Sequence, residues 1–129
     1  MRLLALLLAL LPLLGSACAD RTEQLGEGYF FRDEGGAIRD ILSRRAAGRE
    51  VPATVVSYDH NDDFIIAQQR PKLPPDPLYE AEYDYPDPSR DYFWIIDKRD
   101  DSIVGPLTFQ EYEAARDRYG VPDNLILAW

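Results

Sequence analysis

The sequence predicts an α+β fold: an antiparallel β-sheet of five to six strands, built from hairpins, with one C-terminal α-helix packed on it. Short segments rich in β-branched and aromatic residues, next to three turn sequences, predict the hairpins. A capping motif followed by apolar residues at helical spacing predicts the helix. Because 129 residues support about one domain, these elements are expected to share one fold.

The first hairpin is predicted to begin with a strand at residues 29–31, because this Tyr-Phe-Phe run precedes the turn sequence Asp-Glu-Gly-Gly at 33–36. In the segment that follows, 37–46, the spacing of the apolar residues is compatible with a helix and with a strand. Its apolar residues have helical spacing, whereas at period two Ile38 and Leu42 share one face of a strand. Periodicity alone favours a helix here.

Two further hairpins are predicted in the middle of the chain, where segments with strand composition flank turn-rich sequences. The first joins 54–58 to 64–67, and the second joins 92–96 to 102–104. Segment 92–96 is apolar on both faces, which predicts a central position in the sheet.

The C-terminal helix is predicted over residues 109–119. Thr108 and Glu111 form a capping box before it, and Gly120 stands where a left-handed C-cap is needed. The final residues, 125–129, are so apolar that we expect them to dock on the domain.

The N-terminal segment predicts export and lipid attachment. Arg2 precedes an apolar run at 3–14, which is too short to span a bilayer and is typical of a signal peptide. Three small residues then lead into Cys18, the chain's one cysteine, and this pattern resembles the lipobox of bacterial lipoproteins. The resemblance implies a signal peptide at 1–17 and an acylated Cys18, whose lipid holds the protein on a membrane. The alternative is cleavage after Ala19, which would release a free secreted protein.

The lipobox also sets expectations for the rest of the chain. Residues 18–27 are polar and predict a tether, which leaves 28–129 as the folded domain. In enteric lipoproteins an aspartate directly after the lipidated cysteine favours inner-membrane retention, and Ala19 stands there instead. We therefore expect the protein in the bacterial cell envelope, at the outer membrane and facing the periplasm. With Cys18 acylated, the domain has no thiol for a disulfide or a zinc site.

A loop of unusual composition is predicted at residues 71–91. It holds six of the ten prolines, three tyrosines and six acidic residues, and proline at this density resists strand pairing. Tyrosine rings provide contact area and carboxylates attract a basic partner, so this loop is the candidate partner-binding site. The alternative is a solubilising loop whose tyrosines lie on the sheet. The candidate residues are Tyr79, Glu80, Glu82, Tyr83, Asp84, Tyr85 and Asp87.

Composition and motifs argue against several classes of function. The formal net charge of −9 disfavours nucleic-acid binding, because phosphates require basic surface. The single histidine, His60, lies in a predicted turn, and the sequence has no nucleophile elbow, phosphate-binding glycine loop or zinc-binding helix motif. The acidic turn 59–63 lacks the glycine and distal glutamate of a calcium loop, so turn chemistry accounts for it. We expect no catalytic residues, no metal site and no cofactor.

Four short motifs run through the domain in order. They are Gly28-Tyr29, Asn61-Asp62-Asp63-Phe64-Ile65 leading to Gln68, Tyr92-Phe93-Trp94-Ile95-Ile96-Asp97, and Gly105-Pro106-Leu107. Together they resemble a family of small, functionally uncharacterised bacterial lipoproteins, over residues 28–122. The resemblance implies a compact α+β lipoprotein without known activity and brings no catalytic residues. It also favours a strand, rather than a helix, at 37–44.

These expectations together predict a non-enzymatic, membrane-anchored domain in the periplasm that binds another protein. A finer hypothesis is an inhibitor or immunity protein that neutralises a basic envelope-targeting enzyme. The alternative from another class is a structural envelope component that acts through its fold and anchor alone. An enzyme that uses scattered carboxylates would need a deep polar pocket.

Overall fold

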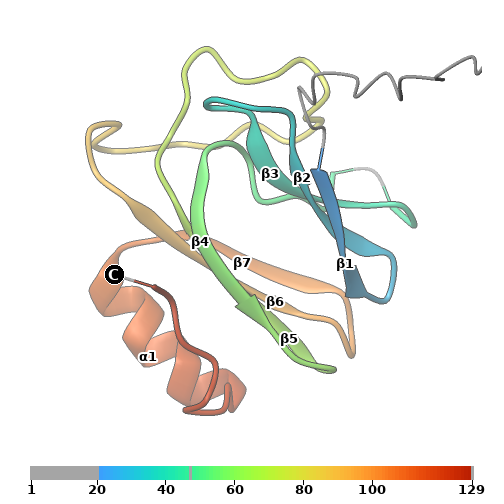
Figure 1. Cartoon of the computed structure of the whole chain (residues 1–129). Coiled ribbons are helices and arrows are strands. Elements are labelled where there is room, and N and C mark those ends of the chain that lie inside the picture. Colours follow the sequence, from blue (N-terminus) through green and yellow to red (C-terminus); the bar gives the residue numbers. More distant parts are fainter. Residues whose placement is uncertain (1–20, 47, 129) are drawn as a thin grey trace, which may run out of the picture.

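The computed structural model describes residues 21–46 and 48–128, and within them it has seven strands and one helix (Figure 1). In chain order these are β1 (Arg21–Gly26), β2 (Tyr29–Asp33), β3 (Arg39–Ser43), β4 (Val55–His60), β5 (Phe64–Gln69), β6 (Tyr92–Asp97), β7 (Ser102–Leu107) and α1 (Phe109–Tyr119). The α+β class and the C-terminal helix are confirmed.

The strands form two antiparallel sheets, so the prediction of a single sheet with five to six strands is wrong. One sheet has the order β1-β2-β3 and the other β4-β5-β6-β7. The break lies between β3 and β4. Val51 forms an isolated bridge with Ile41, and three residues later Thr54 already pairs with Arg70 beyond the end of β5. Pro52 lies between these pairings and has no N–H to continue a ladder.

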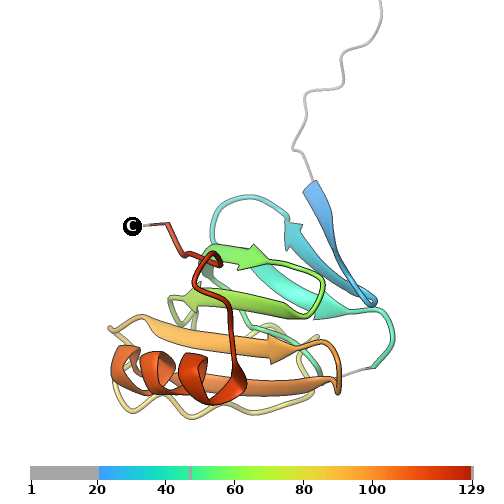
Figure 2. The same cartoon turned by 90° about the horizontal axis from the view of Figure 1, so that it is seen from below.

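Two hydrophobic cores divide the molecule into three layers. The first core lies between the sheets, and the second lies between the β4–β7 sheet and the layer of α1 and the C-terminal tail (Figure 2). Strand β6 lies between β5 and β7 and is buried along its whole length, which confirms the central position predicted for 92–96. Its alternate side chains face the two cores, with Trp94 and Ile96 in the first, and Phe93 and Ile95 in the second.

The predicted tether is largely part of the fold. Residues 21–26 form β1, which pairs with β2 along the edge of the first sheet. Most of β1 is exposed, which explains its polar sequence, but Leu25 is buried in the core between the sheets. Residues 18–20 of the predicted tether, Cys18 included, and the predicted signal peptide at 1–17 lie outside the described residues.

The segment with two possible periods contains strand β3, which confirms the strand that the family resemblance favoured, and the helix favoured by periodicity alone is wrong. Within β3, Ile41 faces the first core, while Asp40 is fully buried on the opposite face. Burial of neighbouring residues on both faces removes the simple alternation that would have identified a strand. The Arg32 guanidinium on β2 compensates the buried carboxylate, since it donates to both oxygens of Asp40 at 2.9 and 2.7 Å.

The remaining local predictions are confirmed. The three hairpins are β2–β3, β4–β5 and β6–β7. Thr108 and Glu111 form the capping box of α1, and Gly120 ends the helix in the left-handed conformation. The tail is docked: the amides of Ile126 and Ala128 donate to the side chains of Asp59 and Ser57, which belong to β4.

A buried lysine joins the two sheets. The Lys98 ammonium donates to the carbonyl oxygens of Leu25 on β1 and Asn61 in the β4–β5 turn, at 2.5 Å each. Burial lowers the pKa of Lys98, while the acidic residues around it oppose this effect. The bonds replace the water that such an ammonium would otherwise need.

Candidate functional site

The acidic, proline-rich segment 71–91 forms a surface strap that connects β5 to β6. It has no helix or strand, and it passes over β3 before it returns to β6 (Figure 1). We refer to residues 71–91 as the strap. Apart from a backbone bond from the Lys72 N–H to the Ala53 carbonyl oxygen, its position depends on side-chain contacts with both sheets.

The middle of the strap alternates between inward and outward side chains. Tyr79, Tyr83 and Tyr85 are half-buried, as is the alanine between the first two. The intervening acidic residues, Glu80, Glu82 and Asp84, are exposed. The segment therefore has one face on the protein and one acidic face in solvent, although it is not a strand.

Tyr79 attaches the strap to the first sheet. Its hydroxyl donates to Asp40 at 2.6 Å and accepts from the backbone N–H of Ala53 at 2.9 Å. Burial, followed by the bond to the Asp40 carboxylate, raises the pKa of Tyr79 well above its ordinary value. Together with the Arg32 guanidinium, this phenol satisfies a carboxylate that would otherwise be costly to bury.

Tyr85 attaches the strap to the second sheet through Gln69, a buried residue at the end of β5. The Gln69 amide nitrogen donates to the Tyr85 hydroxyl at 2.8 Å, and the Trp94 indole N–H donates to the Gln69 carbonyl oxygen at 2.7 Å. Between these two anchors, the ring of Tyr83 packs edge-on against Trp94, with 5.3 Å between ring centroids. The strap thus covers the polar edge of the core between the sheets.

Glu50 is a second buried carboxylate beneath the strap. It is 4% exposed, and it accepts hydrogen bonds from the Tyr83 hydroxyl and the backbone N–H of Ala81. Its Oε1 atom has no hydrogen-bond partner among the described residues. Burial raises the pKa of Glu50, and the bonds from Tyr83 and Ala81 offset only part of that rise.

The raised pKa of Glu50 predicts a pH-dependent cost to stability. A carboxyl group whose pKa is higher in the folded protein contributes stability that is complete below the unfolded pKa, about 4.3, and is lost as pH rises through the folded pKa. Glu50→Gln should therefore be more stable than the parent at pH 7, with a difference that vanishes toward pH 4. Urea unfolding across this range measures it, with the exposed Glu113→Gln as control. A difference that does not change with pH would contradict this account.

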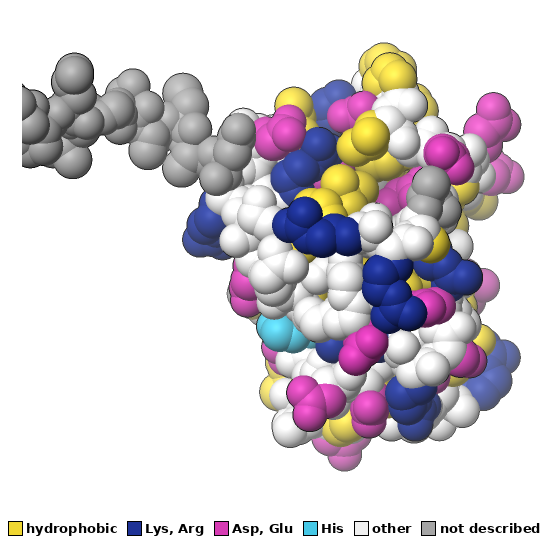
Figure 3. Space-filling view, turned by 90° about the vertical axis from the view of Figure 1, so that its right-hand side faces the viewer, with side chains coloured by type: hydrophobic (Ala, Val, Ile, Leu, Met, Phe, Trp, Pro, Cys, Tyr) yellow, Lys and Arg dark blue, Asp and Glu magenta, His cyan; other side chains and the backbone are white. Residues whose placement is uncertain are grey.

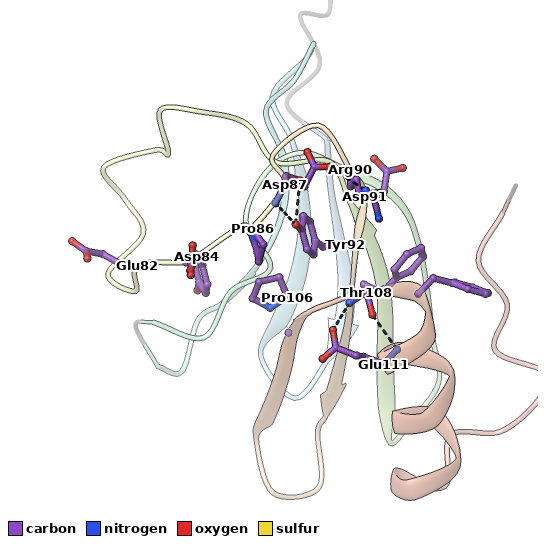
Figure 4. Close-up of a pocket in the computed structure, with 14 residues that line it drawn as sticks. Glu82, Asp84, Pro86, Asp87, Arg90, Asp91, Tyr92, Pro106, Thr108 and Glu111 are labelled. Carbon is purple, nitrogen blue, oxygen red and sulfur yellow. Dashed lines mark hydrogen bonds and ion pairs between the residues drawn. The ribbon is translucent and has the colours of Figure 1, made fainter.

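A groove of about 790 Å³ lies between the end of the strap, strands β6 and β7, and the start of α1 (Figure 4). Its apolar walls are formed by Pro86, Tyr92, Phe93, Pro106 and Phe109. Around them lie five carboxylates and one guanidinium: Glu82, Asp84, Asp87, Asp91, Glu111 and Arg90. The groove is therefore apolar inside and acidic at its rim.

Three of the five carboxylates are already engaged. Asp91 accepts from Gln68 and Arg70, Asp87 accepts from Ser89 and pairs with Arg90 at 3.0 Å, and Glu111 accepts from the backbone N–H of Thr108. In contrast, Glu82 and Asp84 make no ion pair or side-chain hydrogen bond with the described residues. These two exposed carboxylates are the ones available to a ligand.

The structure divides the predicted partner-binding residues into two groups. The three tyrosines, which we expected to offer contact area, use their hydroxyls inside the protein, as in the alternative of tyrosines lying on the sheet. Glu80, Glu82 and Asp84 lie outside, and Asp87 is half-exposed in its ion pair. Sequence reasoning missed Asp40, Glu50 and Gln69, because no local pattern shows that the strap covers them.

The other sequence candidates have local structural roles. His60 ends β4, with its Nε2 atom 3.6 Å from a Glu23 carboxylate oxygen. The Asn61 side chain accepts from the amides of Asp63 and Phe64, which is the turn chemistry predicted for 59–63. In the part of the chain that the structure describes, no three His, Cys, Asp or Glu side chains are grouped as metal ligands. Nor does that part contain a helix long and apolar enough to cross a membrane.

Comparison with known proteins assigns a family. No curated protein and no solved structure matches the chain. One family, described as a protein of unknown function, matches residues 38–128, which include β3 to the C-terminal tail and therefore the strap and the groove. This match confirms the expectation of an uncharacterised domain family. The chain belongs to the DUF3997 family.

Proposed function

We propose that this protein is a non-enzymatic, lipid-anchored binding domain of the bacterial periplasm, and that the exposed carboxylates of the strap contact a basic protein partner. The observation that carries the proposal is the alternation at 79–85, which holds Glu80, Glu82 and Asp84 in one outward row. The inward tyrosines fix this row to both sheets. A fixed row loses less conformational entropy on binding than a free loop with the same charges.

The charge distribution supports a basic partner. Residues 21–49 hold six arginines and five carboxylates, whereas residues 50–128 hold seven basic and seventeen acidic side chains. On the side of β1–β3, basic and acidic side chains are interspersed (Figure 3). The acidic excess thus belongs to the second sheet, α1 and the strap, and a field of one sign accelerates the approach of a partner of opposite sign.

The proposed lipid anchor would hold this domain close to the membrane. Only residues 19 and 20 separate Cys18 from β1, so three Cα–Cα steps of about 3.8 Å limit the distance between them to about 11 Å. A partner would therefore have to be at or near the membrane surface. Replacement of Cys18 by serine should release the protein from the membrane fraction, and continued membrane association of that variant would contradict the anchor.

Neutralising the strap row tests the proposed binding. In Glu80→Gln/Glu82→Gln/Asp84→Asn, a basic envelope protein captured by the full-length parent should bind about tenfold more weakly, with slower association and a smaller dependence on salt. Because all three side chains are exposed, the free energy of unfolding should change by less than about 0.5 kcal/mol. Surface plasmon resonance at two salt concentrations provides the rates.

A matched variant controls for the loss of net charge. Glu113, Asp117 and Asp123 are exposed on the α1 side of the protein, away from the strap, and their amide variants remove the same charge. This control should retain the partner's affinity within about twofold. Equal loss in both triple variants would reduce the proposal to non-specific attraction, and no loss in either would refute it. If the captured partner is an enzyme and is inhibited, the inhibitor or immunity hypothesis is favoured over a structural role.

A further inference from the structure

The groove beside the strap has the size and walls of a binding site. Its volume of about 790 Å³ lies within the range of about 300–1,000 Å³ typical of ligand pockets. Proline and aromatic side chains form its interior, and Phe109, at the first position of α1, is 43% exposed. The ring lies against Phe93 and Tyr112, with centroids 5.4 and 6.3 Å away, so it is held in place.

The charges around the groove determine what it can accept. An anion would meet five carboxylates, and the capping box of Thr108 and Glu111 already uses two of the N–H groups at the helix N-terminus. A cation would meet two exposed, unengaged carboxylates, Glu82 and Asp84, next to an apolar wall. An aromatic wall also favours a cation, and a planar guanidinium more than an ammonium.

We infer that this groove docks an arginine together with a neighbouring aromatic side chain of the partner. The guanidinium binds Glu82 and Asp84, and the partner's ring packs on Phe109 and Pro106. This inference rests on the proposed function and makes it more specific, since it states which side chains of a basic partner are recognised. Basic charge alone would then be insufficient for full affinity.

Three labelled peptides separate charge from ring contact. Acetyl-Gly-Arg-Trp-Arg-Gly-amide carries both features, acetyl-Gly-Arg-Gly-Arg-Gly-amide only the charge, and acetyl-Gly-Gln-Trp-Gln-Gly-amide only the ring. Fluorescence anisotropy with the full chain in neutral detergent should show binding of the first peptide about tenfold tighter than either of the others. Equal binding of the first two, or no binding of the first, would overturn the inference.

Two pairs of variants place the binding in the groove. Phe109→Ala should weaken the first peptide about tenfold and leave the charge-only peptide unchanged, whereas Leu78→Ala, which removes another exposed side chain of the strap, should change neither. Circular dichroism confirms that both variants are folded. Glu82→Lys, at an exposed position, should weaken both arginine peptides, and Glu113→Lys on α1 should not.

The outcomes separate this inference from the proposed function. If Glu82→Lys weakens binding while Phe109→Ala has no effect, the strap attracts basic partners but the groove is not the docking site. If neither variant has an effect on the peptides, while the captured partner still depends on the neutralised strap row, the inference is wrong and the proposed function stands. If the captured partner also binds the neutralised variant as tightly as the parent, both the inference and the proposed function are refuted.

Discussion

Replacing Asp40 by alanine is expected to lower the free energy of unfolding by about 3 kcal/mol, the lower end of the range for breaking a buried ion pair. The substitution removes the acceptor for two bonds from Arg32 and one from Tyr79, and leaves both donors in a half-buried site. Arg32 keeps the exposed Glu34 as a partner at 3.0 Å, which is why the lower end applies. Urea unfolding of the parent and the variant measures the effect.

Two further variants show whether the stability lost in Asp40→Ala includes the contact of the strap with Asp40. Glu34→Ala removes the exposed partner of the same guanidinium and should cost less than about 1 kcal/mol. Tyr79→Phe should cost about 1–2 kcal/mol in the parent and less in the Asp40→Ala background, because the hydroxyl then has no carboxylate to bind. Additive effects would mean that Tyr79 does not hold the strap through Asp40.

Gly105→Ala is expected to be at least as damaging, with a loss of about 3 kcal/mol or more from overpacking and backbone strain together. A Cβ atom at this position would lie 2.4 Å from Cε3 and 2.5 Å from Cδ2 of the Trp94 ring. That ring has little room to retreat, since it is 1% exposed and its indole N–H is bonded to Gln69. The backbone φ of +155° adds strain for any residue with a side chain.

Gly35→Ala separates the clash from the strain. Gly35 also has a positive φ, +94°, but a Cβ atom there would meet nothing within 4 Å. Its replacement should therefore cost only the backbone strain, about 1–2 kcal/mol. Denaturant unfolding followed by tryptophan fluorescence measures both variants. Equal losses at the two positions would show that Trp94 can move and that the packing beneath the strap is looser than described.

Short-range features of the fold could be predicted from the sequence. Each hairpin depends on strand composition on both sides of a turn, and α1 depends on its own capping residues, Thr108 and Glu111, and on Gly120. The division into two sheets could not be predicted in this way. It depends on a change of pairing partner between Val51 and Thr54, which involves strands far apart in the chain.

The strap, the candidate binding site, shows the same limit of prediction from sequence. Composition identified residues 71–91 as an acidic, tyrosine-rich surface segment, and the alternation at 79–85 was present in the sequence. Which face of the strap turns inward could not be predicted from the sequence, because it depends on buried acceptors and donors, such as Asp40 and Gln69, on distant strands. At period two Asp40 lies between Ile38 and Leu42, which was a local sign of a buried carboxylate but not of the segment that covers it.

The account depends most on the inward orientation of the strap tyrosines, since this orientation leaves the carboxylates as the proposed binding face. Burial raises the pKa of Tyr79, Tyr83 and Tyr85. Titration of the full chain with ¹³Cζ-labelled tyrosine, followed by NMR, tests it directly. The account predicts that these three phenols remain protonated at pH values where a free tyrosine derivative, with a pKa of about 10, has ionised. Ionisation of all three near pH 10 in a chain that is still folded would contradict it.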